Sequence, residues 1–189
     1  MIFGARRGFS AGRQGISLRL DRNEADVLVQ MLSQVDELVS DSDESATAAD
    51  DPLGELLGTD TGQRPTDPAL LRLFPDGYLD DDEAAGDFRR FTQRGLREVK
   101  GERVRSAIAV LDRIDDRGSA VAVTAEQADA MLGALNDVRL VLGVRLGIVA
   151  DDQDVTEDWD DDDPRLVSFA AYQWLTWLQA GLLDALGSS

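Results

Sequence analysis

The sequence contains neither cysteine nor histidine. Without cysteine there is no disulfide bond, no thiolate nucleophile and no zinc–thiolate site. Without histidine the chain lacks the commonest general base and the commonest transition-metal ligand. A metal site would therefore need oxygen ligands alone, which suit magnesium, calcium or manganese.

Basic residues are also scarce. The 19 Lys and Arg stand against 37 Asp and Glu, which gives a net charge of −18, and Lys100 is the only lysine. Because nucleic-acid binding requires basic side chains that neutralise phosphates, we do not expect direct DNA binding. The length of 189 residues predicts a single domain, 1–189, which can form a core without metal or disulfide cross-links.

One apolar stretch, 166–186, is long enough to cross a membrane. Polar residues interrupt it, its two tryptophans lie near its middle, and an acidic segment precedes it where an anchor would carry basic residues. We therefore expect no membrane span but a core helix enclosed by its neighbours. Residues 1–22 contain no apolar run of the length that a signal peptide needs.

The overall pattern predicts a mainly α fold, a single-domain helical bundle with a short N-terminal β-hairpin. Residues 1–20 alternate apolar and polar side chains between glycines, which is typical of a hairpin. Asp21 and Glu24 have the spacing of a capping box and predict the start of a helix. A flexible polar loop is expected at 40–50, because this segment has no apolar residues at helical spacing.

Several further helices are expected. Asp-Pro pairs predict short helices that run from Asp51-Pro52 to Gly58 and from Asp67-Pro68 to Pro75. A longer helix should begin near Asp80 and bend or end at Gly95. Another should follow and end near Gly118.

The last third of the chain predicts two more long helices. Val121–Val123 reads as a brief extended segment, and Thr124 with Gln127 has capping-box spacing for a helix that ends at Gly147. A flexible acidic loop is expected at 151–163. Pro164 would open the last helix.

The N-terminal hairpin is locally basic. Flexible arginines can contact phosphates or acidic protein surfaces. The alternative is that these charges only keep a hairpin edge soluble. The candidate contact residues are Arg6, Arg7 and Arg13.

A second candidate consists of polar residues within the otherwise apolar helix expected at 124–147. They are Asn136, Asp137, Arg139 and Arg145. Because buried polar groups need partners, we predict pairing with Asp87, Arg89 or Arg90, in a network that fixes the register of two helices. The alternative is a pocket for a small ligand.

Two acidic clusters are weaker candidates. The run Asp80–Glu83 resembles a magnesium site, but consecutive helical carboxylates point in different directions, and the helix dipole accounts for the run. In the loop 151–163, Trp159 would be a docking anchor for a basic partner, or the loop is simply solvated. No nucleophile elbow, P-loop or dinucleotide-binding glycine motif occurs, so we expect no catalytic residue, cofactor or metal.

Three segments carry a resemblance to a known family. They are LFPDGYLDDDEAAGDFRRFTQRGLREVK at 73–100, LNDVRLVLGVRLGI at 135–148 and YQWLTWL at 172–178. The chain resembles an actinobacterial family encoded beside the ClpS adaptor, whose members are of unknown function or are described as transcriptional regulators. One branch is AosR-like and is described as regulating the response to oxidative stress. The resemblance implies a cytoplasmic, mainly helical protein that works through partners.

We therefore expect a non-enzymatic regulator that acts through a protein such as a sigma factor or RNA polymerase. The alternatives are an accessory protein in ClpS-linked proteolysis and a magnesium-dependent hydrolase. A homodimer through the last helix is also expected. The regulatory branch of the family is associated with redox sensing through cysteine, which this chain lacks, so sensing would require Met31, Met131 or a partner.

Overall fold

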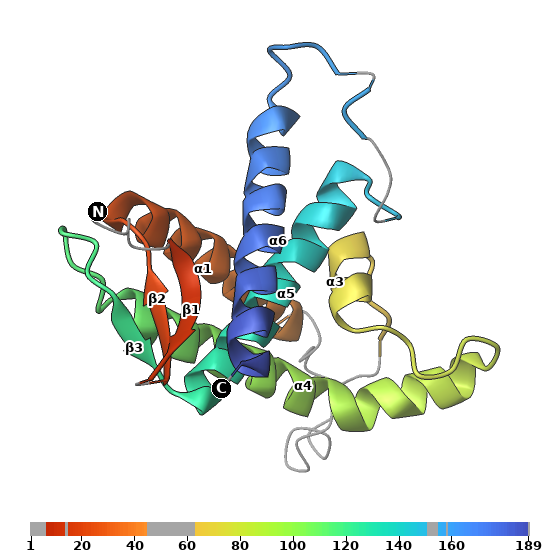
Figure 1. Cartoon of the computed structure of the whole chain (residues 1–189). Coiled ribbons are helices and arrows are strands. Elements are labelled where there is room, and N and C mark those ends of the chain that lie inside the picture. Colours follow the sequence, from red (N-terminus) through yellow and green to blue (C-terminus); the bar gives the residue numbers. More distant parts are fainter. Residues whose placement is uncertain (1–6, 14, 45–62, 151–154, 158, 189) are drawn as a thin grey trace.

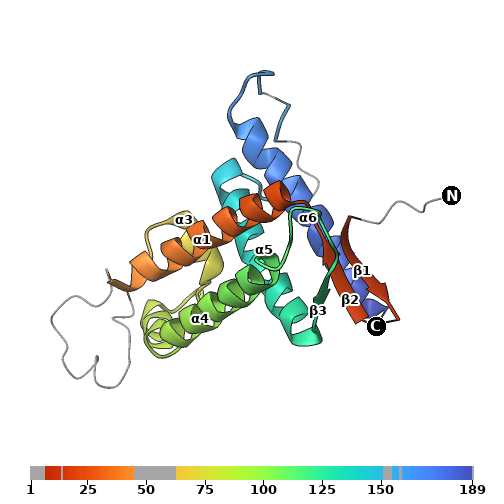
Figure 2. The same cartoon turned by 90° about the vertical axis from the view of Figure 1, so that its left-hand side faces the viewer.

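The computed structural model describes residues 7–13, 15–44, 63–150, 155–157 and 159–188. Within these residues the chain forms five helices and one three-stranded antiparallel sheet, as Figures 1 and 2 show. The predicted mainly α architecture with an N-terminal hairpin is confirmed. The short helix expected at 51–58 lies outside the described residues.

The sheet consists of β1 (Gly8–Gly12), β2 (Gly15–Arg19) and β3 (Val121–Val123). The hairpin pairs Phe9 with Leu18, and β3 extends the sheet on the other side of β2 by pairing Val121 with Leu18. The segment expected only to be extended is therefore the third strand. Alternating residues of β2 and β3 are buried, which is the period-two pattern of a sheet with one face against the core.

Helix α1 (Arg22–Glu44) begins with the predicted capping box. The backbone N–H of Asp21 donates to Glu24 Oε2 at 2.8 Å, and the backbone N–H of Glu24 donates to Asp21 Oδ1 at 2.9 Å. The helix continues to Glu44, so the first part of the expected loop at 40–50 is helical. Residues 45–50 lie outside the described part.

Two other helices start where the sequence predicts. Asp67 caps α3 (Pro68–Leu73) by accepting from the N–H of Ala69 at 2.7 Å. Thr124 and Gln127 form a complete capping box at the start of α5 (Ala125–Leu146). Gly147 ends α5 at a φ of 73°, a left-handed conformation that favours glycine.

The predicted break at Gly95 is wrong, because a single helix, α4, spans Asp82–Leu111. Asp81, rather than Asp80, caps it by accepting from the N–H of Ala84 at 2.9 Å. One interior glycine costs a helix only about 1 kcal/mol relative to alanine. The hydrogen bonds and packing on both sides of Gly95 therefore outweigh that cost.

The sequence predicted that the last helix is enclosed by its neighbours. This prediction is wrong for α6 (Arg165–Gly187). Leu175, Leu178 and Leu182 are fully buried, but Val167 and Leu183 expose 77% and 53% of their surface. Among the described elements, the helix packs mainly against α5 and β1, and part of its apolar surface stays outside the core. In the described part of the chain, no helix has the length and apolar character to cross a membrane.

Helix α5 is the centre of the fold and contacts α1, α3, α4 and α6. Helix α6 lies along β1, whereas the first half of α4 projects from the body (Figure 1). Gly8 on β1 has a φ of 81°, and a Cβ there would lie 2.7 Å from Cη2 of Trp177. A residue without a side chain is therefore required where α6 meets the first strand.

Candidate functional site

The interface between α4 and α5 holds a buried ion pair. Lys100 Nζ donates to Asp137 Oδ1 at 2.7 Å, and the two side chains are only 14% and 5% exposed. Lys100 also lies 5.6 Å from the centroid of the Phe74 ring. The predicted polar link between two long helices therefore exists, but its basic member is Lys100 and not Arg89 or Arg90.

Asp137 belongs to a closed part of the core. Its Oδ2 is buried, and no described residue donates a hydrogen bond to it. Leu135 and Val138 beside it in sequence are also buried. The pair joins α4 to α5 within the core, and neither residue is among those that line the cavity described below.

Arg139 points to a different place from Asp137. Its guanidinium donates to Gln179 Oε1 and, at 3.4 Å, to the hydroxyl of Tyr172 on α6. The guanidinium carbon lies 5.2 Å from the centroid of the Tyr172 ring. The predicted pairing of Arg139 with Asp87 is thus replaced by contacts with neutral groups.

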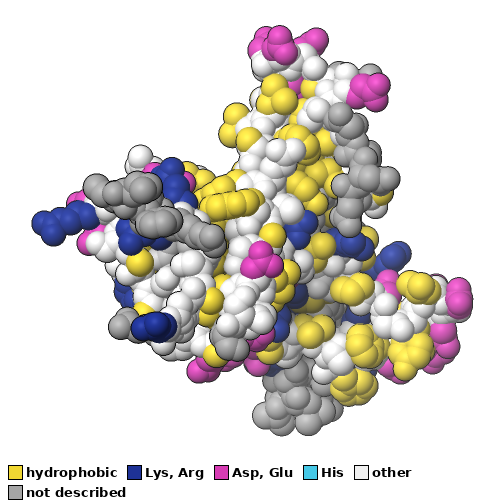
Figure 3. All heavy atoms as spheres, in the orientation of Figure 1, with side chains coloured by type: hydrophobic (Ala, Val, Ile, Leu, Met, Phe, Trp, Pro, Cys, Tyr) yellow, Lys and Arg dark blue, Asp and Glu magenta, His cyan; other side chains and the backbone are white. Residues whose placement is uncertain are grey.

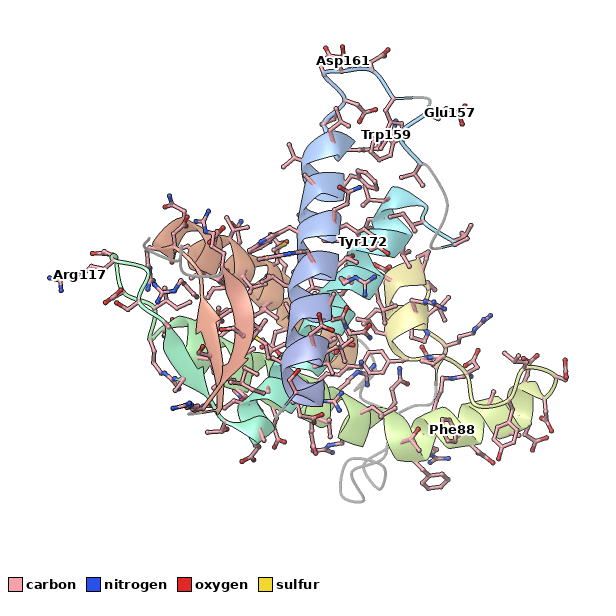
Figure 4. The ribbon with its side chains drawn as sticks, in the orientation of Figure 1. Phe88, Arg117, Glu157, Trp159, Asp161 and Tyr172 are labelled. Carbon is pink, nitrogen blue, oxygen red and sulfur yellow. The ribbon has the colours of Figure 1, made fainter. Side chains whose placement is uncertain are left out.

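Arg139 and Asn136 line an open cavity of about 240 Å³ between α3, α5 and α6. Arg72 from α3 and Tyr172 from α6 contribute to the same wall, and Figure 4 shows Tyr172 on the side of α6 that faces α5. Basic side chains gather beside α6 in this region of Figure 3. Of the residues predicted at this site, two therefore line a pocket and Asp137 does not.

The other basic residue predicted on α5 lies at the surface. Arg145 pairs with Asp67, with a distance of 2.6 Å between Nη2 and Oδ2. Partial burial acts to raise the pKa of Asp67, but the hydrogen bond and charge of Arg145, together with the Ala69 N–H, lower it below its usual value of 3.8. The pair links the start of α3 to the end of α5.

The projecting end of α4 carries the residues predicted as partners of α5. Arg89 pairs instead with Asp76, and both side chains are largely buried. Asp87 and Arg90 are exposed. The α4 residue that pairs with Asp137 is Lys100.

Exposed apolar side chains surround this end of α4. We call them the apolar arm, and they are Tyr78, Leu79, Phe88 and Phe91. Leu79 and Phe91 expose 89% and 72% of their surface, and the rings of Tyr78 and Phe88 meet edge to face at 6.2 Å. Figure 3 shows hydrophobic side chains together with acidic ones at this end, and Figure 4 places Phe88 there.

The arginines of the hairpin are partly engaged with the protein itself. Arg7 pairs with Asp21 and Glu24, which also form the cap of α1. Arg13 is exposed in the turn of the hairpin, and Arg6 lies outside the described residues. The described part of the hairpin thus offers less free positive charge to a partner than its sequence indicates.

Trp159 lies against the start of α6. The Arg165 guanidinium carbon is 4.4 Å from the centroid of its ring, and Phe169 meets the ring edge to face at 5.9 Å. Asp163 pairs with Arg165 at 2.6 Å, and this hydrogen bond holds the pKa of Asp163 below its usual value. Trp159 is partly covered by these contacts, as Figure 4 shows.

The acidic run at the start of α4 has the positions that stabilise the N-terminus of a helix. Asp81 is its N-cap, and Asp82 and Glu83 lie in its first turn, near the positive end of the dipole. Within the residues that the structure describes, no group of three or more carboxylates is placed to hold a metal ion.

Sequence patterns did not identify several residues that matter at these sites. Lys100, Gln93 and Arg97 lie on the buried side of α4, and Arg72 and Gln179 adjoin Arg139. Lys100 is the only lysine in the sequence, and this was the one indication that it could have a specific role. No comparable signal marks Gln179, whose role depends on how α6 crosses α5.

These features define a mainly helical protein with a buried ionic link, a polar pocket and an exposed apolar arm. The chain belongs to the family described as Domain of unknown function (DUF2017), whose profile matches residues 6–186.

Two mycobacterial relatives carry a functional name. A Mycobacterium tuberculosis protein named Oxidative stress regulator AosR is 36% identical over 180 residues, which cover 88% of this chain and 80% of the relative. A Mycobacterium bovis protein of the same name matches to the same extent. No solved structure matches the chain.

Proposed function

We propose that this chain is a non-enzymatic cytoplasmic regulator that acts on transcription by binding another protein, such as a sigma factor or RNA polymerase. The observation that carries the proposal is the apolar arm on the projecting end of α4. The regulatory name of the mycobacterial relatives supports it.

The apolar arm has the composition of a binding surface. Aromatic residues are enriched at the centres of protein interfaces, where they supply most of the binding energy. Phe91 and Leu79 are apolar but expose most of their surface to water, which does not favour the solubility of the protein alone. They lie close in sequence to the acidic run Asp80–Glu83. The partner surface should therefore have an apolar recess with a basic rim.

The net charge of −18 also favours a partner whose binding surface has a basic rim. Proteins that bind DNA present positive surfaces, and such a surface attracts an anionic protein while DNA repels it. Regulation through the protein component of a transcription complex therefore agrees with the charge better than direct promoter binding.

An oxidant signal would have to reach this chain through a partner. The chain has no thiol, and Met131 is completely buried while Met31 is partly buried. Oxidation of a methionine requires access to its sulfur. We therefore assign the chemistry of any oxidant sensing to the protein that this chain binds.

The test compares matched exposed positions. Phe91→Ser and Leu79→Ser remove members of the apolar arm, and Val27→Ser changes a residue of α1 that is 48% exposed. Binding to purified actinobacterial RNA polymerase, its core enzyme and its principal sigma factor would be measured at physiological salt. We expect each arm variant to lose at least about tenfold in affinity, as substitution at the centre of an interface does, and Val27→Ser to bind like the wild type.

Four outcomes would contradict the proposal in different ways. Equal binding by all variants would remove the arm from the interface. Tight sequence-specific binding of DNA by the chain alone would overturn the protein-mediated mode. Binding only to the ClpS adaptor would favour the role in proteolysis, and stabilisation by magnesium in a melting experiment would favour the hydrolase.

A further inference from the structure

The cavity between α3, α5 and α6 has an unusual charge for this protein. Two arginines, Arg72 and Arg139, line it with Asn136, Tyr172 and apolar residues of α5 and the segment after it. No Asp or Glu is among the described residues that line it, although the chain carries 37 of them. Among the described residues, the lining of the cavity is therefore positively charged, in a molecule whose net charge is strongly negative.

Arg139 is held in place without a counter-ion. Its described hydrogen-bond partners, Gln179 and Tyr172, are neutral, and no described carboxylate forms an ion pair with it. Its Nε is buried, and no described acceptor reaches it. A guanidinium that is partly removed from water normally has an anionic partner, because burial of an unpaired charge is costly.

The wall around Arg139 is arranged in advance. The ring of Tyr172 lies against the guanidinium, and Gln179, which is 9% exposed, accepts from Nη1. The ring lies close to α5, because a Cβ at Gly143 would be in ordinary van der Waals contact with Tyr172 Cε2 at 3.6 Å. These contacts fix the direction of the guanidinium, so little side-chain freedom remains to be lost when a ligand binds.

We propose that this cavity binds a small anionic metabolite through a carboxylate or phosphate group, with Arg139 as the principal contact and Arg72 as the second cation. The planar guanidinium donates to two oxygens of such a group at once. The volume of about 240 Å³ is below the usual range for drug-sized ligands, so the ligand is small. The cavity and the apolar arm lie on different elements, and this site does not depend on the proposed protein partner.

Calorimetric titration of the full chain tests the site. The probes are inorganic phosphate, succinate and pyruvate, each compared with sodium chloride at the same ionic strength. The variants are Arg139→Gln and Arg72→Gln. The control is Arg145→Gln, which removes one positive charge from the same helix as Arg139 but from a residue that does not line the cavity.

We expect at least one probe to bind beyond the chloride control. Arg139→Gln should weaken binding at least tenfold, Arg72→Gln should weaken it by a smaller factor, and Arg145→Gln should bind like the wild type. Binding of phosphate alone or of the carboxylates alone supports the site and identifies the anionic group.

A second measurement guards against a variant that fails to fold. In the wild-type chain, the Nε–Hε resonance of Arg139 should shift during the titration, whereas that of Arg145 should not. The proposal is overturned if no probe binds beyond chloride, or if Arg139→Gln and Arg145→Gln weaken binding equally.

Discussion

Lys100 of α4 donates to Asp137 of α5 at 2.7 Å, and this ion pair is almost closed to solvent. Removal of one member of a buried pair leaves the other charge without compensation, which typically destabilises a protein by about 3–5 kcal/mol. Replacement of both members by apolar residues of similar volume is often neutral. The pair therefore makes a sharp prediction about stability.

Lys100→Met should lower the unfolding free energy by about 3 kcal/mol or more, because Asp137 would then be buried alone. The double variant Lys100→Met/Asp137→Leu should recover most of the loss. Urea unfolding of the wild type, both single variants and the double variant measures the coupling between the two residues. Additive losses in the double variant would show that the pair is not an energetic unit.

Gly95→Ala and Gly133→Ala should change the stability of the protein to different extents. A Cβ at Gly95 has no neighbour within 4 Å, so Gly95→Ala should stabilise the exposed helix interior by about 0.5–1 kcal/mol. A Cβ at Gly133 would lie 2.8 Å from Cδ of Arg103, so Gly133→Ala must displace that side chain and should gain less or lose stability. Thermal unfolding compares the two, and a larger gain at Gly133 would contradict the packing of α4 on α5.

Asp67 should make stability depend on pH in the acid range. Its pKa is lowered in the folded chain, so its ionised form contributes stability that is complete above its usual pKa of 3.8 and is lost as pH falls through the lower folded value. Asp67→Ala should cost about 1 kcal/mol at pH 7, as loss of a helix cap does.

The difference between the wild type and Asp67→Ala should therefore shrink as pH falls below 4. Arg145→Ala removes the partner of Asp67. The difference in unfolding free energy between this variant and the wild type should shrink over the same pH range. Chemical denaturation at a series of pH values checks both. A difference in unfolding free energy that stays constant down to pH 2 would contradict the lowered pKa of Asp67. Because all variants share the large net charge, the comparison between them cancels its general effect on stability.

The exposed apolar residues of α6 predict a homodimer. Light scattering at micromolar concentration should give the mass of two chains, because Val167, Trp177 and Leu183 expose half or more of their surface. Val167→Glu and Leu183→Glu, tested separately, would locate the contact, with Val27→Glu on α1 as an exposed control. A monomer mass for the wild type would rule the dimer out.

Local signals predicted several helix ends correctly, although the end expected near Gly118 lies at Leu111. The capping boxes at Asp21 and Thr124, the Asp-Pro start of α3 and the glycine end of α5 all depend on residues within four positions of each other. Hydrogen bonds at a helix end form within the segment itself. A single sequence therefore contains the information that these features require.

Features that depend on distant packing were predicted poorly. The continuity of α4 through Gly95 requires support from α1 and α5, and the exposure of α6 depends on how few elements reach it. The partner of Asp137 was missed because Lys100 lies 37 positions away, on a helix that the sequence divided in two. The sequence indicated which residues were unusual, but not which of them meet.

The contact of α6 with β1 has a consequence for how the protein is made. The ribosome makes β1 well before α6, the helix that packs along it. During translation the outer edge of this hairpin has no cover, and such unpaired edges are prone to aggregation. The contact between the hairpin and its helix must therefore wait until α6 has left the ribosome.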